Sequence, residues 1–307
     1  MKIFLVWMGT DLLDRYSELF PEDRLNILIS FAYLKGQFTV LKKYRDKMGM
    51  VYIDSGTYTQ FKNKDNAPHV TEGNYLRFTR RTKDFFSVIF NYDADFTTNG
   101  FERNSPCQLR LEDAGVPVVP VVHNIENDEI GIYIRKGHDM ISLGSTQVKN
   151  PRDIDTAFKP LSGLTTKVHL LGRTETKFLT RKPFYSADSS TYALAASVGA
   201  VLFWNSDKEA DEYGDKTDYI YMGERDYYQG GKHRYTHIDE YEGRQEFESF
   251  LQNEFGFNRD DLIGGKGNFN KQIVNMRYYS ILEKEINKIY LEKNWIDDQG
   301  KLMPIKG

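Results

Sequence analysis

Three aspartates stand directly after runs of apolar residues, and their side chains suit chemistry at the anomeric carbon of a sugar. They are Asp54, Asp93 and Asp188. Cleaving a bond at an anomeric carbon needs a carboxylate that traps an oxocarbenium-like centre and an acid that protonates the leaving group. Carboxyl groups that share a pocket can divide these roles, because burial and mutual repulsion raise one pKa while hydrogen bonds keep another group ionised. The alternative, equally open for each aspartate, is that it caps the helix after its strand.

The segment around Asp188 is the one about which the chain is organised. A short aromatic run enters from Pro183 and stops at this aspartate, and Ser189, Ser190 and Thr191 follow it. A hydroxyl among these residues can cap a helix that begins at Tyr192. An acid between the end of a strand and the start of a helix is where α/β barrels keep their catalytic groups. Taken alone, the segment favours a cap or turn residue, so its interpretation depends on the rest of the chain.

Eight apolar runs recur along the first two-thirds of the chain, and each is followed by Gly, Asp, His, Ser or Thr. The runs are 2–8, 26–34, 50–53, 85–92, 116–122, 140–143, 168–171 and 183–187. The second run fits a helix equally well, because it is short and unbroken. Strands that are apolar on both faces are typical of covered parallel sheets. The fold class we predict is therefore α/β, a (β/α)8 TIM barrel with its site at the carboxyl ends of the strands.

The remaining third of the chain has a different character. We expect the barrel core in residues 1–205, and a Tyr-rich insertion and a C-terminal helix in residues 206–307. Residues 207–237 are rich in Tyr, Gly and charge, which is typical of an inserted loop or hairpin. The apolar residues of 272–295 recur at roughly helical spacing. This spacing predicts a terminal helix that packs on the barrel.

Composition narrows the class of protein. The 307 residues are 40% hydrophobic and 28% charged, as is typical of a soluble globular protein. No apolar run approaches the ~20 residues that span a bilayer, and the N-terminus reads as a first strand rather than a signal peptide. Cys107 is the only cysteine, which excludes a disulfide framework and a thiolate zinc site and fits a reducing cytoplasm. The net charge of −3 means that binding to nucleic acid requires a local basic face.

Six short motifs resemble, in order, those of the tRNA-guanine transglycosylases. Asp54-Ser55-Gly56-Thr57-Tyr58 resembles the family's Asp-Ser-Gly-Gly-aromatic stretch, and Phe90-Asn91-Tyr92-Asp93 resembles its strand ending in a base-reading Asp. Val121-Val122-His123, Leu143-Gly144 and Leu170-Leu171-Gly172 stand in the places of its Val-Gln-Gly, Gly-Gly and Leu-Met-Gly. Tyr185-Ser186-Ala187-Asp188 stands where the family has its nucleophilic Asp. The form of this last motif is closer to the phage and bacterial branch that places 7-deazaguanines in DNA.

The resemblance implies a role for each matched residue. Asp188 would attack C1′ of the target nucleoside, Asp54 would be the general acid and base, and Asp93 would bind the guanine-like edge. The target base would leave its stack to enter a pocket at the barrel mouth. The other residues that the resemblance assigns to base binding are Ser55, Gly56, Tyr58, His123, Gly144, Leu171 and Gly172. Among these, Tyr58 and Leu171 would cover the two faces of the base, and the Gly144 N–H would lie near its carbonyl.

The chain also departs from the family pattern. It lacks the zinc motif of three Cys and one His that follows the barrel of the tRNA enzymes, and it lacks their tRNA-binding additions. His123 replaces a Gln, which changes the hydrogen-bond donors and acceptors offered to the base. Asp95 stands where queuine-type bacterial enzymes have Cys. We expect no cofactor and no metal, and we interpret His169, which lies inside a predicted strand, as structural.

The leading expectation is a cytoplasmic bacterial or phage enzyme that exchanges guanine in DNA for a free 7-deazaguanine such as preQ0 or preQ1. Alternatives are a tRNA-guanine transglycosylase, an N-glycosidase or glycoside hydrolase that uses water as the acceptor, and a non-catalytic barrel that binds nucleic acid. Candidate phosphate contacts are Arg77, Arg80 and Arg81 on the helical crossover 71–83, together with the Tyr-rich segment 213–234. The alternative for both is a solvated surface. No membrane partner is expected.

Overall fold

The computed structural model describes residues 1–34, 36–62, 68–144, 146–223 and 235–305. The chain divides into two compact units. The barrel unit comprises Met1–Trp7, Leu25–Ser189 and Asn287–Gly307, and the second unit comprises Met8–Arg24 and Ser190–Ile286. These units are defined by contacts rather than by independent folding, so the domain boundary expected after residue 205 stays a prediction.

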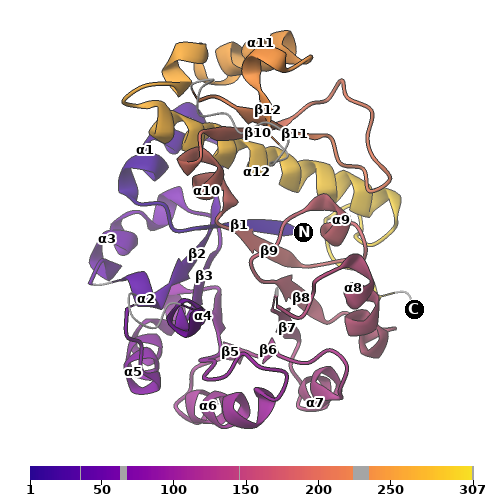
Figure 1. Ribbon diagram of the computed structural model, residues 1–307. Helices are drawn as coiled ribbons and strands as arrows, with labels where there is room; N and C mark the ends of the chain where they lie inside the picture. Colours follow the sequence, from indigo (N-terminus) through magenta and orange to yellow (C-terminus); the bar gives the residue numbers. More distant parts are fainter. Residues whose placement is uncertain (35, 63–67, 145, 224–234, 306–307) are drawn as a thin grey trace. The chain divides into compact units, whose positions relative to one another are not determined.

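Within the described residues, the barrel unit contains an all-parallel sheet of nine strands (Figure 1). The strands are β1 Lys2–Val6, β2 Asn26–Ser30, β3 Val51–Asp54, β4 Val88–Phe90, β5 Val118–Val119, β6 Val121–Val122, β7 Met140–Leu143, β8 Lys167–Leu170 and β9 Ser186–Ser189. Their order is β5-β4-β3-β2-β1-β9-β8-β7-β6. Each of the eight apolar runs therefore contributes to the sheet, as predicted.

The two edge strands of this sheet are halves of one strand. Pro120 separates β5 from β6, and a proline has no backbone N–H with which to continue a strand ladder. β5 pairs with β4, and β6 pairs with β7. The carbonyl oxygen of Pro120 still accepts a hydrogen bond of 2.9 Å from the N–H of Ser142 on β7. The sheet thereby forms a (β/α)8 barrel, which confirms the predicted fold class.

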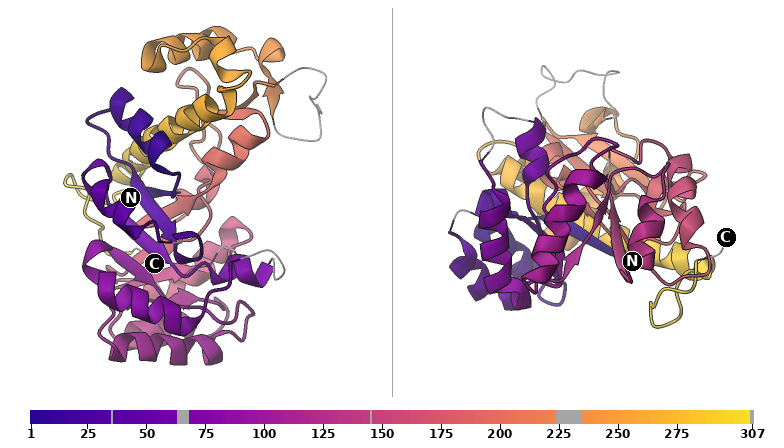
Figure 2. Two further views of the ribbon diagram at one scale, coloured as in Figure 1. Left: turned by 90° about the vertical axis from the view of Figure 1, so that its left-hand side faces the viewer. Right: turned by 90° about the horizontal axis from the view of Figure 1, so that it is seen from below.

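Helices surround the strands of the barrel, and Figure 2 shows them on the outer side of the sheet. They are α2 Phe31–Leu34, α3 Phe38–Lys43, α4 Thr57–Lys62, α5 Glu72–Thr82, α6 Phe101–Asp113, α7 Glu129–Arg135, α8 Pro151–Phe158 and α9 Thr176–Leu179. The second apolar run, residues 26–34, forms a strand followed by a helix. Its first half is β2, whose pairing with β3 ends at Ser30 and Asp54, and its second half is α2.

Aromatic and aliphatic side chains fill the barrel interior. They are Phe4, Leu28, Tyr52, Phe90, Val121 and Met140. The rings of Phe4 and Tyr52 stack with centroids 3.7 Å apart. The imidazole of His169 lies among these rings, 4.9 Å from the centroid of Phe90 and 5.6 Å from that of Tyr52. The interior of the barrel is thus an apolar core in which His169 is fully buried.

The second unit contains a three-stranded sheet and several helices. The elements are α1 Thr10–Leu19, α10 Thr191–Ser197, β10 Ala200–Trp204, β11 Thr217–Tyr221, β12 Thr236–His237, α11 Arg244–Phe255 and α12 Gly267–Glu292. Asn275 of α12 is fully buried. It accepts a hydrogen bond from the N–H of Leu202 and donates to the carbonyl oxygens of Tyr192 and Ala200. One amide therefore holds α10 and β10 against α12.

Two predictions for the C-terminal third have different outcomes. The terminal helix is confirmed as α12, and its last residues belong to the barrel unit, where the Tyr290 hydroxyl donates to the carbonyl oxygen of Leu179 at 2.7 Å. Part of the Tyr-rich segment forms β11, antiparallel to β10. Residues 224–234 lie outside the described residues. Among the helices that the structure describes, none has the length and apolar character needed to cross a bilayer.

Candidate active site

Asp54, Asp93 and Asp188 come together at the carboxyl ends of the barrel strands. Asp54 is the last residue of β3, Asp93 lies three residues beyond β4, and Asp188 lies near the end of β9. Burial raises the pKa of the Asp54 carboxyl to about 7, and the charges of Asp188 and Asp93 act in the same direction. The structure therefore places the three carboxylates within electrostatic reach of one another.

The carboxylate of Asp188 is held through one of its two oxygens. Its side chain is only 6% exposed. Oδ1 accepts a hydrogen bond of 2.8 Å from the backbone N–H of Gly172 and lies 3.2 Å from Nε2 of His169. Gly172 has a φ of 65°, a left-handed conformation that glycine adopts without strain. Gly172, predicted to bind the base, thus contacts the carboxylate predicted to be the nucleophile.

His169 is a site residue that sequence reasoning interpreted as structural. It is fully buried, and its Nδ1 lies 2.8 Å from Oγ of Ser186. Ser186 and Asp188 are two residues apart on β9, so their side chains point to the same face, and His169 pairs in register with Ser186. The sequence feature that could have identified this contact is a histidine and a serine within otherwise apolar strands.

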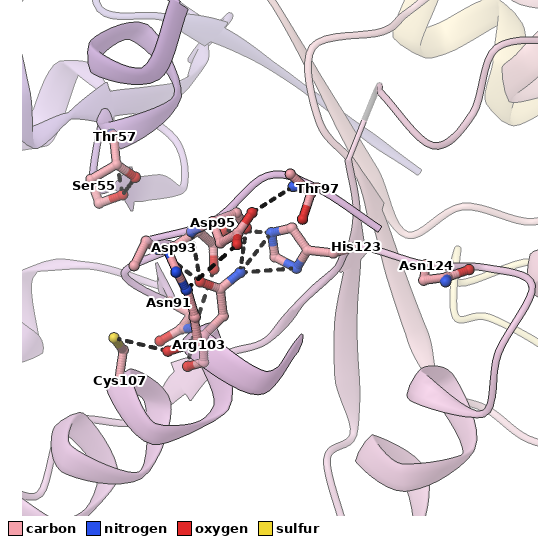
Figure 3. Close-up of polar contacts among 12 residues, drawn as sticks. Ser55, Thr57, Asn91, Asp93, Asp95, Thr97, Arg103, Cys107, His123 and Asn124 are labelled. Atoms are coloured by element: carbon pink, nitrogen blue, oxygen red, sulfur yellow. Dashed lines mark hydrogen bonds and ion pairs between the residues drawn. The ribbon is translucent and has the colours of Figure 1, made fainter. Parts of the chain in front are cut away.

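Asp93 belongs to a second polar cluster (Figure 3). Its Oδ1 accepts a hydrogen bond of 3.2 Å from the Asn91 amide, and its Oδ2 lies 3.6 Å from Nε2 of His123. Burial raises the pKa of Asp93, while His123 lowers it. Burial also disfavours the charged form of His123, but Asp93 and Glu129 outweigh it and raise the histidine pKa to about 10. The imidazole thus lies between two carboxylates, with Oε1 of Glu129 3.7 Å from its Nδ1.

Two further buried residues position this cluster, and neither was predicted. Glu129 accepts hydrogen bonds from the backbone N–H of His123 through both carboxylate oxygens, each at 3.1 Å. Asn104 accepts from the N–H groups of Ala94 and Asp95 and donates to the Asp95 carbonyl oxygen at 2.7 Å. Both residues lie on helices rather than at strand ends, so the strand-end pattern carried no signal for them.

A pocket of about 350 Å³ lies next to Asp93. Its lining residues are Thr57, Gln60, Phe61, His69, Tyr92, Asp93, Ala94 and Phe96. The aromatic walls were not predicted. Tyr58 does not line this pocket; its ring contacts the edge of Phe96, with centroids 5.2 Å apart. Leu171 packs against the apolar interior of the barrel, so the covering of both base faces by these two residues stays a prediction.

Ser55 and Gly56 shape the backbone that follows β3, whereas Gly144, which follows β7, has room for a side chain. The buried Ser55 hydroxyl lies 2.8 Å from that of Thr57. Gly56 has a φ of 75°, and a side chain there would place Cβ 2.4 Å from Cβ of Ala32, so only glycine fits. A Cβ at Gly144 would meet its nearest neighbour at 3.7 Å. The protein itself therefore does not require a glycine at this position.

The structure does not bring Arg77, Arg80 and Arg81 to the three aspartates. All three are exposed on α5. After the last turn of this helix the chain passes Lys83 and enters β4 at Val88. The Lys83 ammonium donates a hydrogen bond of 2.8 Å to the carbonyl oxygen of Gly115, which precedes β5. Arg80 and Arg81 therefore lie toward the amino ends of the strands, opposite the mouth.

A different arginine follows the strand next to Asp188. Arg173 comes directly after Gly172, and its side chain is 22% exposed. Its guanidinium stacks over the ring of Phe178 at 4.3 Å and lies 3.5 Å from a Glu175 carboxylate oxygen. Nε of Arg173 is buried and has no hydrogen-bond partner. This arginine is a cation at the mouth of the barrel that the sequence analysis did not single out.

Comparison with known proteins identifies no relative. No family model, no curated protein and no solved structure matches the chain. In the part of the chain that the structure describes, no group of three or more His, Cys, Asp or Glu side chains is placed to hold a metal ion. The class that the fold and the site define is an α/β barrel with a carboxylate cluster at the carboxyl ends of its strands.

Proposed function

We propose that the protein is a transglycosylase that exchanges guanine in DNA for a free 7-deazaguanine base. The observation that carries the proposal is the convergence of three carboxylates with different environments. Asp188 is fixed by hydrogen bonds, Asp54 has a pKa of about 7, and Asp93 lines a pocket with aromatic walls. A nucleophile, a proton carrier and an acceptor for base N–H groups are what base exchange at C1′ requires.

The reaction then proceeds in two balanced halves. Asp188 forms a bond to C1′ as the bond from C1′ to N9 of guanine breaks, and the electron pair passes to the base. Asp54 donates its proton to the departing guanine. In the second half, the carboxylate of Asp54 takes the N9 proton of the incoming base, whose nitrogen attacks C1′. The bond from C1′ to Asp188 breaks and returns its electron pair to the carboxylate.

The pocket beside Asp93 suits a planar heterocycle that carries N–H donors. Phe61, Phe96 and Tyr92 offer apolar ring surface for stacking. Asp93 offers a carboxylate oxygen; burial raises the pKa of this carboxyl, and His123 acts in the opposite direction. A carboxylate accepts the paired N–H groups of a guanine-like edge, whereas adenine presents a ring acceptor at the corresponding position.

The experiment follows labelled guanine in two polynucleotides. DNA and tRNA that carry labelled guanine are each incubated with the protein, with preQ0 or preQ1 supplied in turn. We expect release of guanine from DNA that depends on the added base, with that base incorporated in equal amount. The control is the same reaction with Asp188→Asn, which retains the shape of the side chain and removes the nucleophile.

Other outcomes identify the alternatives. Release of guanine without incorporation of a base indicates an N-glycosidase. Exchange confined to tRNA identifies a tRNA-guanine transglycosylase. Binding of DNA with neither release nor a covalent adduct indicates a non-catalytic barrel. Each of these three results contradicts the proposal.

A further inference from the structure

We propose that His169 and the Gly172 N–H make the Asp188 carboxylate unsymmetrical, so that Oδ2 is the nucleophile and Oδ1 remains anchored. We also propose that this anchoring acts mainly on the second half of the reaction, in which Asp188 is the leaving group. The inference rests on the proposed function for its chemistry, but the arrangement of the imidazole can be tested without it. His169 is in this view a positioning residue, because His169 acts through Asp188 rather than on the substrate.

The geometry assigns both donors to the same oxygen. The Gly172 N–H lies 2.8 Å from Oδ1, and Nε2 of His169 lies 3.2 Å from it. An ionised carboxylate only accepts hydrogen bonds, so Nε2 must carry the proton. In a neutral imidazole Nδ1 is then an acceptor, and the Ser186 hydroxyl, 2.8 Å away, donates to it. The side chains of Asp188 and Ser186 thus select one tautomer of His169.

The groups packed around the imidazole are aromatic rings, hydroxyls and the Asp188 carboxylate. Phe4 and Phe90 present ring surface to it. Tyr52 also faces it, and burial raises the pKa of that phenol above its usual range, so its hydroxyl stays protonated. Ser186 contributes a hydroxyl, and Asp188 contributes the negative charge at the edge of the ring. On the neighbouring strand, the Ser142 hydroxyl donates to the backbone carbonyl of His169 and does not bond its ring.

The two donors affect the two halves of the reaction in opposite directions. They stabilise the carboxylate more than the glycosyl ester, because hydrogen bonds to a charged group are the stronger ones. They therefore reduce the nucleophilicity of Asp188 slightly in the first half. In the second half they stabilise the carboxylate as its bond to C1′ breaks, which makes it a better leaving group. Without His169 the ester should form and then persist.

The kinetic experiment compares His169→Phe, His169→Gln and Ser142→Ala with the wild type. His169→Phe retains a flat ring among aromatic neighbours and removes the N–H. We expect its second half-reaction to slow by roughly tenfold or more, with the covalent adduct accumulating at steady state. His169→Gln should restore part of the rate through its amide N–H, and Ser142→Ala should behave as the wild type. Equal slowing of both halves in His169→Phe would indicate a purely structural role.

A second measurement does not depend on activity or on His169→Phe folding. The ¹⁵N shifts of the His169 ring report which nitrogen carries the proton. We expect the Nε2–H tautomer in the wild type and in Ser142→Ala, and loss of this single tautomer in Ser186→Ala. A wild-type ring protonated at Nδ1, or at both nitrogens at neutral pH, overturns the inference. If the shifts are as expected and no base is exchanged, only the proposed function is wrong.

Discussion

At the scale of single residues, Asp54 has the chemistry that a proton carrier needs. Its pKa of about 7 leaves both protonation states populated near neutral pH, so one group can donate to the departing base and accept from the incoming base. We expect the rate of exchange to be highest near pH 7 and to fall on both sides, because the acid form is lost above and the base form below. A pH profile of kcat checks this. A rate that is constant from pH 5.5 to 8.5 would exclude Asp54 as the proton carrier.

Replacing Asp54 tests its role directly. Asp54→Asn retains the size of the side chain and removes the titrating proton, so turnover should fall by about 10²–10⁴-fold while the free base still binds. Turnover and base affinity are measured separately, by exchange assay and by calorimetry. Normal turnover with weak base binding would assign Asp54 to recognition instead.

The same residue should affect stability in a pH-dependent way. The folded-state pKa of Asp54 is raised from 3.8 to about 7, so its favourable contribution is complete below pH 4 and is lost as the pH rises through 7. Asp54→Asn should therefore unfold like the wild type at pH 4 and be more stable at pH 8. A tenfold change in an equilibrium constant corresponds to about 1.4 kcal/mol, so the gain can reach about 2–4 kcal/mol. Urea unfolding at the two pH values measures it, and a gain that does not change with pH would contradict the raised pKa.

Asp188 is the residue on which the covalent mechanism depends. Asp188→Ala should abolish base exchange and leave no glycosyl adduct, because no other carboxylate replaces its Oδ2. Mass spectrometry of the protein after incubation with DNA detects the adduct in the wild type. Circular dichroism controls for folding. Appreciable exchange by a folded Asp188→Ala variant would refute the covalent mechanism.

At the scale of elements, the direction of each strand and helix determines which cationic side chains lie at the mouth of the barrel, where we propose that the polynucleotide binds. Arg173 follows β8 at the mouth, whereas α5 carries Arg80 and Arg81 away from it. Each phosphate contact that is lost lowers the salt slope of binding by about one unit. Arg173→Ala should therefore lower the slope by about one and weaken DNA binding, without changing the affinity for the free base. Binding titrations at several salt concentrations measure the slope.

The double variant Arg80→Ala, Arg81→Ala is the matched control for this experiment. It removes two exposed positive charges from α5, so it changes the net charge of the protein without changing the mouth. We expect its salt slope to equal that of the wild type. A slope that falls in the double variant and not in Arg173→Ala would place the phosphate contacts on α5, as the sequence alone suggested.

At the scale of the whole molecule, the three aspartates and both polar clusters lie within Leu25–Ser189 of the barrel unit. A metal site with several thiolate ligands cannot form within this chain, since Cys107 is the only cysteine. We expect the purified protein to hold no stoichiometric zinc and to keep its melting temperature when a chelator is added. Metal analysis and thermal unfolding with and without the chelator check this. Stoichiometric zinc, with loss of the fold on chelation, would contradict the expectation.

The sequence alone determined the barrel and the convergence of the aspartates. Eight apolar runs of strand length, each followed by a polar residue, are enough to predict parallel strands that are covered on both faces. Side chains at the carboxyl ends of such strands meet however far apart they lie in the chain. Asp54, Asp93 and Asp188 could therefore be selected before any contact was known.

Only the tertiary structure decided which side chains support those aspartates. Strands that are apolar on both faces lack the alternation that specifies register, so the pairing of His169 with Ser186 and the contact with Asp188 could not be read from the runs. Asn104 reaches its partners from α6, and a helix has no strand-end pattern to mark it. The basic face of α5 was visible in the sequence, but the end of the barrel that it faces depends on the direction of the helix in space.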